Sequence, residues 1–254
     1  MRAMHVEIHD GESVPDSPSL LLIHGAGGNR LHWPPGIRRM PGWRVLALDL
    51  PGHGKSPGPG SNSIEAYAEI VLDGLQTNMV EKAIPVGHSM GGAIALLLAL
   101  EAPEKFAGLV LIGSGARLRV APAILEASAQ TSTFPQAVAA IMQSAFSESA
   151  PARMVELARR RMLEVDPAVL HDDFTACDEF DVMARLAEIR LPTLVLCGTE
   201  DQLTPLKYSE FLAAYIPDAV LVRIAGAGHM AMLEQPQAVA SALREFLAAI
   251  APQS

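Results

Sequence analysis

Ser89 carries the strongest chemical signal in the chain, because glycines stand two residues before it, two residues after it and again at position 92. An apolar run of strand length, 83–86, precedes this serine, and a helical stretch begins close to it. A serine at a tight turn from strand to helix projects its hydroxyl from a strained bend, so small residues are needed where the backbone passes closely. The start of a helix also favours negative charge through its unpaired N–H groups. The pattern predicts a nucleophilic Ser89, with the N–H of Met90 as a donor to an oxyanion.

Asp201 and His229 fit the two partners that such a serine needs. A serine hydroxyl is a weak nucleophile until an imidazole takes its proton and a carboxylate orients that imidazole. Asp201 follows an apolar run at 193–196, and His229 lies in a glycine-containing loop after a run at 220–224. We prefer Asp201 to its neighbour Glu200 because of its position within the loop. His88, inside the serine turn, is interpreted as a packing residue whose side chain points away from Ser89.

A glycine-rich loop at 24–29 is expected to supply the second oxyanion donor. Acyl transfer needs two backbone N–H groups, and the second usually comes from the loop after an early strand. We assign it to the N–H of Ala26, with that of Gly27 as the alternative. Taken alone, the loop also resembles a phosphate cradle, but it lacks the spacing of nucleotide-binding loops. The segment 49–56 ends in Gly-Lys-Ser without the earlier glycine of such loops, so it is interpreted as a structural turn.

The elements that position these residues alternate between strand and helix. Apolar runs at 20–23, 45–48, 83–86, 109–112, 193–196 and 220–224 have strand length. Continuous apolarity is typical of strands covered on both faces, as in a parallel sheet. Helices are expected at 63–79, 89–102, 206–215 and 236–250, with Ser63 capping the first and with Pro205 and Pro236 opening the last two. The predicted class is α/β, a mostly parallel sheet flanked by helices.

The segment 115–190 interrupts this alternation. It contains helical stretches at 137–146 and 152–163 and no convincing strand. We expect a helical cap inserted after the sixth strand, over the carboxyl edge of the sheet, where α/β folds bind ligands. The single domain is then a core of residues 1–114 and 191–254 with a cap of residues 115–190.

The candidates for substrate binding are mostly apolar residues of the cap and of nearby loops. They are Gly27, Trp33, Phe134, Met142, Phe146 and Leu203, and Phe174 and Met183 complete the apolar set of the cap. For each apolar side chain, packing between cap and core is the alternative.

The composition favours a compact protein that acts on small molecules. Half of the 254 residues are hydrophobic, and the formal net charge of −9 opposes binding to nucleic acid. The first ten residues lack the features of a signal peptide, and no apolar run has the length of a membrane span, so a cytoplasmic protein without a membrane partner is expected. Cys177 and Cys197 lie in unrelated contexts, and a disulfide between them stays open. No cofactor and no metal is expected, and a homodimer stays open.

Together these motifs resemble the α/β-hydrolase superfamily, in particular its branch of small esterases, cofactor-free perhydrolases and carbon–carbon bond hydrolases. Five motifs follow the family's order over nearly the whole chain: His-Gly-x-Gly-Gly at 24–28, Asp-x-Pro-Gly-His-Gly-x-Ser at 49–56, Gly-His-Ser-Met-Gly-Gly at 87–92, Gly-x-x-Asp at 198–201 and Gly-His at 228–229. The resemblance implies the α/β-hydrolase fold, attack of Ser89 on a carbonyl carbon and later activation of water by His229. Members that open epoxides or carbon–halogen bonds carry Asp at the nucleophile position, so Ser89 favours ester-like substrates.

We therefore expect a carboxylesterase that cleaves small to medium apolar esters through an acyl-enzyme, with a small-molecule ester as its partner. Cleavage of a carbon–carbon bond, or perhydrolysis, by the same three residues is the alternative. A ligand-sensing protein with slow turnover is a second alternative from a different class.

Overall fold

A computed structural model describes residues 4–11 and 17–250 of the chain. The strands are β1 (His5–Asp10), β2 (Ser19–Ile23), β3 (Arg44–Asp49), β4 (Ala83–His88), β5 (Leu109–Ile112), β6 (Thr193–Gly198) and β7 (Val220–Ile224). The α-helices are α1 (Pro35–Arg38), α2 (Ile64–Thr77), α3 (Met90–Glu101), α4 (Pro122–Ser128), α5 (Phe134–Ala145), α6 (Ala152–Leu163), α7 (Pro167–Glu179), α8 (Leu206–Tyr215), α9 (Ala231–Glu234) and α10 (Pro236–Ile250). Short 3₁₀ helices occur at Arg30–His32, Pro103–Lys105 and Met183–Glu188.

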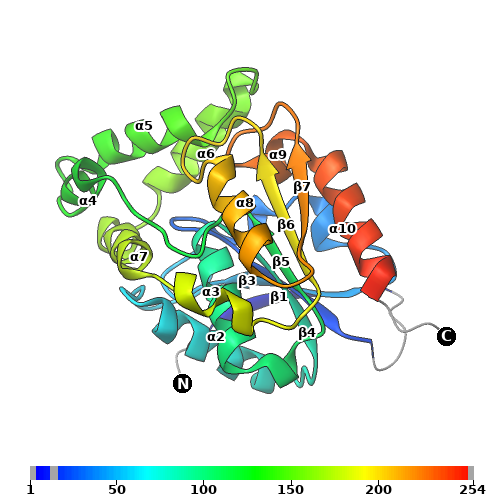
Figure 1. Cartoon of the computed structure of the whole chain (residues 1–254). Helices are drawn as coiled ribbons and strands as arrows, with labels where there is room; N and C mark the ends of the chain where they lie inside the picture. The colour runs from blue at the N-terminus through cyan, green and yellow to red at the C-terminus, as the bar shows by residue number, and fades with distance from the viewer. Residues whose placement is uncertain (1–3, 12–16, 251–254) are drawn as a thin grey trace.

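The strands form one sheet in the order β1-β3-β2-β4-β5-β6-β7 (Figure 1). All neighbouring strands pair in parallel except β1, which runs antiparallel to β3 at one edge. Parallel strands need a crossover between them, and the intervening helices supply it. The predicted α/β class, with a mostly parallel sheet flanked by helices, is confirmed.

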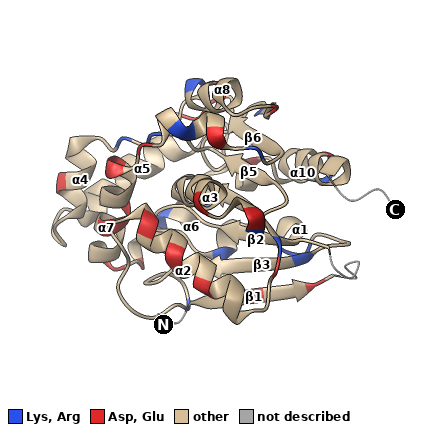
Figure 2. Ribbon diagram, turned by 60° about the horizontal axis from the view of Figure 1, so that its bottom comes forward, with Lys and Arg blue, Asp and Glu red and all other residues tan. Residues whose placement is uncertain are grey.

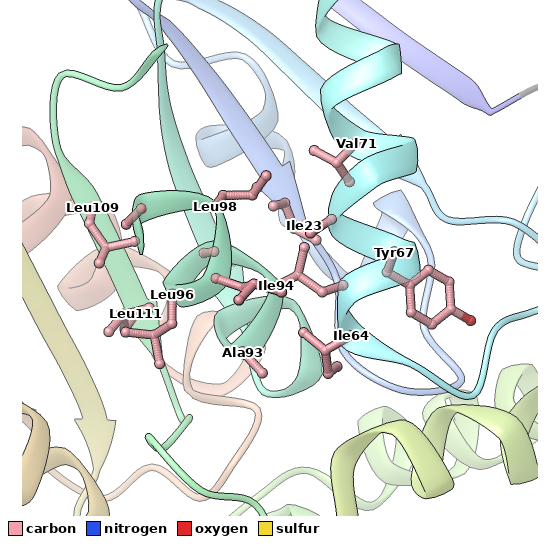
Figure 3. Close-up of a cluster of buried hydrophobic side chains, with 14 of the residues drawn as sticks. Ile23, Ile64, Tyr67, Val71, Ala93, Ile94, Leu96, Leu98, Leu109 and Leu111 are labelled. Atoms are coloured by element: carbon pink, nitrogen blue, oxygen red, sulfur yellow. The ribbon is translucent and has the colours of Figure 1, made fainter. Parts of the chain in front are cut away.

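The sheet is covered on both faces, which explains why its strands read as continuous apolar runs. In β2, Leu21 and Ile23 pack on one side with α2, α3 and α8, whereas Leu20 and Leu22 pack on the other with α1 and α10. Figure 3 shows the first of these clusters, in which side chains of α2 and α3 face the strands. Because successive side chains of a strand point to opposite faces, each apolar run contributes to two cores at once.

The sequence located these elements closely. All six predicted core strands are present, and β4 and β6 continue to His88 and Gly198. The predicted N-cap of α2 is also present, since the side chain of Ser63 accepts a hydrogen bond from the N–H of Ala66. One count was wrong: the helical segment follows β5, the fifth strand of the described residues, rather than a sixth. The expectation had counted one strand too many before that point.

The segment 115–190, which we call the helical insertion, contains α4 to α7 and lies beyond the carboxyl ends of the strands (Figure 1). It packs on the loops there: the N–H of Met230 donates to Ala145 O at 3.2 Å, and Leu170 of α7 lies against Gly27. Its separation from the core as a cap stays a prediction, and residues 1 and 254, the outer bounds of the predicted core, lie outside the described residues.

Charged residues are concentrated on the helices and loops rather than in the middle of the sheet (Figure 2). β2 and β5 contain none. Within the described ranges, no helix combines the length and the apolar character needed to cross a membrane.

Candidate active site

Ser89 stands at the turn between β4 and α3 in a conformation that side chains rarely adopt, with φ 54° and ψ −120°. Such a backbone costs about 1–3 kcal/mol and persists only where its surroundings enforce it. Its N–H donates to Ile112 O at 3.0 Å, and its carbonyl accepts from Gly92 N at 2.8 Å and from Ser114 Oγ at 2.8 Å. These bonds hold the turn to β5 and to the start of α3.

The glycines around Ser89 are required by space. A Cβ at Gly87 would lie 2.1 Å from Gly91 O, and a Cβ at Gly91 would lie 2.2 Å from Ile23 O. Both distances are far below van der Waals contact, so the strand, the turn and the helix approach this closely only because position 87 and position 91 lack side chains.

His229 and Asp201 meet on the loops after β7 and β6. The Nδ1 of His229 lies 2.9 Å from Asp201 Oδ2, and both residues are buried. The other oxygen, Oδ1, accepts from the N–H groups of Leu203 and Thr204 at 2.9 and 2.8 Å, and Thr204 Oγ1 donates to Oδ2 at 2.8 Å. Four hydrogen bonds therefore hold the carboxylate in place. The structure brings Asp201 rather than Glu200 to the histidine.

Electrostatics favour the ionised form of Asp201. Burial alone would raise the pKa of this carboxyl, but the charge and hydrogen bond of His229, followed by the hydrogen bonds of Thr204, outweigh burial and lower it. An ionised Asp201 accepts a proton-bearing Nδ1, which leaves Nε2 of a neutral His229 as the basic nitrogen.

Ser89 and His229 line the same two spaces beneath the helical insertion. One is an enclosed pocket of about 60 Å³ with an apolar lining that includes Met142 and Phe146. The other is a more open cavity of about 320 Å³ that leads outward past Leu118 and Val120. We call them the enclosed pocket and the open cavity. The arrangement offers a substrate two spaces of unequal volume that share Ser89 and His229 in their walls.

The N–H groups of the loop after β2 differ in their hydrogen-bond acceptors. The N–H of Gly28 donates to Gly25 O at 3.0 Å, and the N–H of Gly27 donates to Asp173 Oδ2 at 2.8 Å. Ala26 lines both the enclosed pocket and the open cavity. Because the N–H of Gly27 is directed to Asp173, the geometry favours Ala26 as the donor. Met90 begins α3, where N–H groups have no partner within the helix.

Asp173 is a functional candidate that the sequence analysis missed. It lies on α7, is fully buried, and besides Gly27 it accepts from His53 Nε2 at 2.8 Å and from Tyr67 Oη at 2.6 Å. Burial opposes charge on His53, but the Asp173 carboxylate outweighs burial and raises the pKa of that imidazole. The available signal was an aspartate at position 173 on the apolar face of a helix whose other buried positions are Val169, Leu170, Ala176 and Cys177.

His88 packs beneath the catalytic candidates, as expected. Its Nε2 lies 3.0 Å from the carbonyl oxygen of His229, and because a carbonyl only accepts, this nitrogen carries the proton. Burial, reinforced by the neighbouring His229, lowers the pKa of His88 well below its usual value. A neutral His88 therefore holds the backbone of His229 rather than moving protons.

The substrate-binding candidates divide into two groups. Met142 and Phe146 line the enclosed pocket, Leu203 and Phe174 line both spaces, and Met183 lines a separate outer cleft. Gly27 instead contacts Asp173 and Leu170. Trp33, which precedes α1, and Phe134, at the start of α5, are buried in a hydrophobic cluster and line neither the enclosed pocket nor the open cavity. Apolar lining residues that the sequence did not single out are Ile141, Ala145, Ala158, Met162 and Met230.

The two cysteines are free and buried, so they form no disulfide with each other. Burial raises the pKa of Cys197 to about 11 and raises that of Cys177 further, which makes both thiols poor nucleophiles. Across residues 4–11 and 17–250, no three His, Cys, Asp or Glu side chains gather as they would around a metal ion.

Comparisons with known proteins agree on one family of hydrolases. Residues 20–242 match the alpha/beta hydrolase family. The chain is 29% identical over 260 residues to a pimeloyl-[acyl-carrier protein] methyl ester esterase of Neisseria meningitidis, covering 93% of this chain and 96% of the relative. It is 30% identical to a putative carbamate hydrolase RutD of Stutzerimonas stutzeri, covering 96% and 97%. A solved thermophilic esterase is 36% identical, with a TM-score of 0.83 and coverage of 98% of this chain and 99% of that one.

Proposed function

The chain belongs to the alpha/beta hydrolase family, and we propose that it is a serine carboxylesterase in which Ser89, His229 and Asp201 form the catalytic triad. One observation carries the proposal: the strained Ser89 lines the same spaces as His229, whose Nδ1 lies 2.9 Å from the buried Asp201. A hydroxyl forced out of a tight turn beside an oriented imidazole is the arrangement that acyl transfer requires.

In the proposed first half-reaction, Nε2 of His229 takes the proton of Ser89 while Oγ attacks the carbonyl carbon of the ester. Asp201 stabilises the imidazolium that results, without itself becoming protonated. The imidazolium then gives its proton to the leaving alcohol, and an acyl group stays on Oγ. In the second half-reaction His229 takes a proton from water while the water oxygen attacks the acyl carbon. The bond between that carbon and Ser89 Oγ then breaks, the imidazolium returns its proton to Oγ, and the carboxylic acid leaves.

The negative charge that develops on the carbonyl oxygen is assigned to the N–H groups of Ala26 and Met90. Support for Ala26 comes from its exposure to both spaces and from the engagement of Gly27 N with Asp173. Support for Met90 comes from its place at the first turn of α3, where the helix also favours an anion. Removing one such donor in other enzymes lowers kcat about 10²- to 10³-fold.

The two unequal spaces bear on the size of the substrate. The enclosed pocket of about 60 Å³ is much smaller than the open cavity of about 320 Å³. We propose that it receives the short part of the ester and that the open cavity receives the longer arm. The helical insertion then acts as the cap that selects the substrate. A relative named for methyl ester cleavage is consistent with a short group on one side.

The proposal is tested with p-nitrophenyl acetate, butyrate and octanoate, using the wild type and Ser89→Ala. We expect turnover by the wild type, a preference among chain lengths and a loss of at least about 10³-fold in the variant. Equal rates for the two proteins would defeat the proposal. A dienoate ring-fission product and a peroxide-dependent assay, run in parallel, separate the esterase from a carbon–carbon hydrolase and from a perhydrolase. Negligible turnover of every substrate would favour the ligand-sensing alternative.

A further inference from the structure

The open cavity beside Ser89 continues into a second hollow at the surface. This outer cleft has a volume of about 340 Å³ and lies between the start of the helical insertion and α8. Arg119 and Tyr208 line both the open cavity and the outer cleft. A substrate arm that passes outward from Ser89 through the open cavity therefore reaches the side chains of the outer cleft.

The charge of this route is opposite to that of the whole chain. The protein has a net charge of −9, yet the outer cleft is lined by Arg117, Arg119 and Lys207. Among the described residues that line the open cavity or the outer cleft there is no Asp or Glu. Figure 2 shows basic residues close to the start of α8. Three cations along one apolar-walled passage create a positive potential at its outer end.

The cleft cations are only partly neutralised by the protein itself. The carboxylate of Asp181 lies 3.8 Å from Arg117 Nε and 4.0 Å from Arg119 Nη2, at the long limit for an ion pair. Lys207 Nζ lies 5.8 Å from the centroid of the Tyr208 ring, a cation–π contact that leaves its charge in place. One carboxylate thus faces two guanidinium groups, and an added anion would be attracted.

Arg119 is held in position for this task by backbone carbonyls. Its Nη1 donates to Leu118 O and to Asp178 O, while the neighbouring Val120 N–H donates to Asp178 Oδ1 at 2.9 Å. These bonds tie the start of the helical insertion to the end of α7. The guanidinium is therefore anchored at the junction of the open cavity and the outer cleft, with its side chain 42% exposed to an incoming anion.

We propose that the outer cleft binds a carboxylate at the far end of the substrate's longer arm, so that the preferred substrates are half-esters of dicarboxylic acids. This inference rests on the proposed function, because it uses Ser89 as the point at which the arm begins. The short alkyl group of the half-ester occupies the enclosed pocket, the aliphatic chain follows the open cavity, and the terminal carboxylate accepts hydrogen bonds from the guanidinium groups of Arg117 and Arg119.

The test compares monoethyl esters of glutaric, adipic and pimelic acid with ethyl esters of monocarboxylic acids of the same chain lengths, by pH-stat. We expect kcat/KM to favour the half-ester at one chain length by about fivefold or more, and raising the ionic strength from about 0.05 M to about 0.5 M to reduce that preference. Arg119→Gln lowers kcat/KM by about fivefold more for the half-ester than for the neutral ester of the same chain length. The matched control is Arg153→Gln, which removes an exposed arginine of α6 and the same unit of charge.

Each outcome separates this inference from the proposed function. Turnover of both ester classes through Ser89 without a preference, or an equal loss for both classes in Arg119→Gln, overturns the carboxylate site alone. A second readout does not require turnover: calorimetric titration of Ser89→Ala with monoethyl adipate, and of the double variant with Arg119→Gln. Weaker binding to the double variant supports the site even if esterase activity fails, and equal binding overturns it.

Discussion

Asp173 provides the sharpest test of how the helical insertion governs the site. It lies on α7 and accepts hydrogen bonds from three distant parts of the core: the N–H of Gly27, Nε2 of His53 and Oη of Tyr67. The bond to Gly27 turns that N–H away from the substrate spaces, next to the N–H of Ala26 that is proposed to hold the oxyanion. We predict that Asp173 is a positioning residue for the oxyanion loop.

The magnitude follows from what Asp173→Ala leaves behind. Three donors lose their acceptor in a fully buried place, and each unsatisfied group costs about 1–3 kcal/mol. Removing one partner of a buried ion pair typically costs about 3–5 kcal/mol in all, which we take for the loss of unfolding free energy. The loop keeps its Gly28 N to Gly25 O bond, so we expect kcat to fall about tenfold rather than by the full effect of a lost oxyanion donor.

Asp173→Asn is the conservative rescue. Its amide oxygen replaces Oδ2 as acceptor for Gly27 and His53, and its NH₂ group faces Tyr67. We expect kcat to return to within about threefold of the wild type, because the geometry of the loop is kept although the charge is lost. Tyr67→Phe is the matched control, since it leaves the bonds of Asp173 to Gly27 and His53 in place. It removes the hydrogen bond to the other carboxylate oxygen and the one that Tyr67 Oη accepts from the N–H of Ser61 at 2.9 Å. It should lower stability by about 1–2 kcal/mol with kcat unchanged.

The assays are esterase kinetics, urea unfolding and hydrogen exchange of the Gly27 amide by NMR. Faster exchange of this amide in Asp173→Ala than in Tyr67→Phe is expected and does not depend on turnover. If Asp173→Ala and Tyr67→Phe lowered kcat by the same factor, or if the Gly27 amide exchanged equally in both, the positioning role would be refuted and Asp173 would be a stabilising residue only.

Three further predictions concern the turn, the acid and pH. Gly91→Ala puts a Cβ 2.2 Å from Ile23 O and should prevent folding or lower the unfolding free energy by several kcal/mol; a stable, active variant would contradict the geometry. Asp201→Asn should keep the fold, as measured by circular dichroism, and lower kcat about 10⁴-fold through the wrong imidazole tautomer; a loss below about tenfold would exclude Asp201 as the orienting acid. Burial, followed by the charge of Arg161, lowers the pKa of His32 from 6.5 to about 4, so the unfolded state takes up a proton that the folded state does not. Its contribution is present above pH 6.5 and is lost at about 1.4 kcal/mol per pH unit as the pH falls toward 4, so urea unfolding of His32→Gln should depend less steeply on pH by that amount. Parallel pH curves for His32→Gln and the wild type would count against this contribution.

The fold was predictable because its signals are local. Strands covered on both faces must be apolar throughout, and this made β2, β4 and β5 readable from the sequence. The family, the α/β-hydrolase fold and a hydrolase of the carboxylesterase type are confirmed by the sheet and by the comparisons. The glycines at 87 and 91 were informative for a steric reason that the structure makes explicit.

The rest of the site depends on contacts between distant segments. Asp173 meets Gly27 across 146 positions of the chain, and no local pattern relates the two. Trp33 and Phe134 have large apolar side chains of the kind that line pockets, yet both are buried in a hydrophobic cluster. A large apolar side chain can either line a pocket or pack in a core, so the sequence could not distinguish the two. The three cations of the outer cleft come from two distant segments of the chain. Arg117 and Arg119 follow β5, whereas Lys207 lies at the start of α8, so their proximity appears only in the fold.

The central claim is that Ser89 is activated by His229, and covalent labelling tests it most directly. The protein is treated with diethyl p-nitrophenyl phosphate, and the adduct is located by mass spectrometry of the intact chain and of its peptides. We predict one diethylphosphoryl group on the Ser89 peptide, no adduct in Ser89→Ala and labelling slowed at least about 10²-fold in His229→Ala. An adduct on another residue, or equal labelling of the wild type and His229→Ala, would contradict the claim.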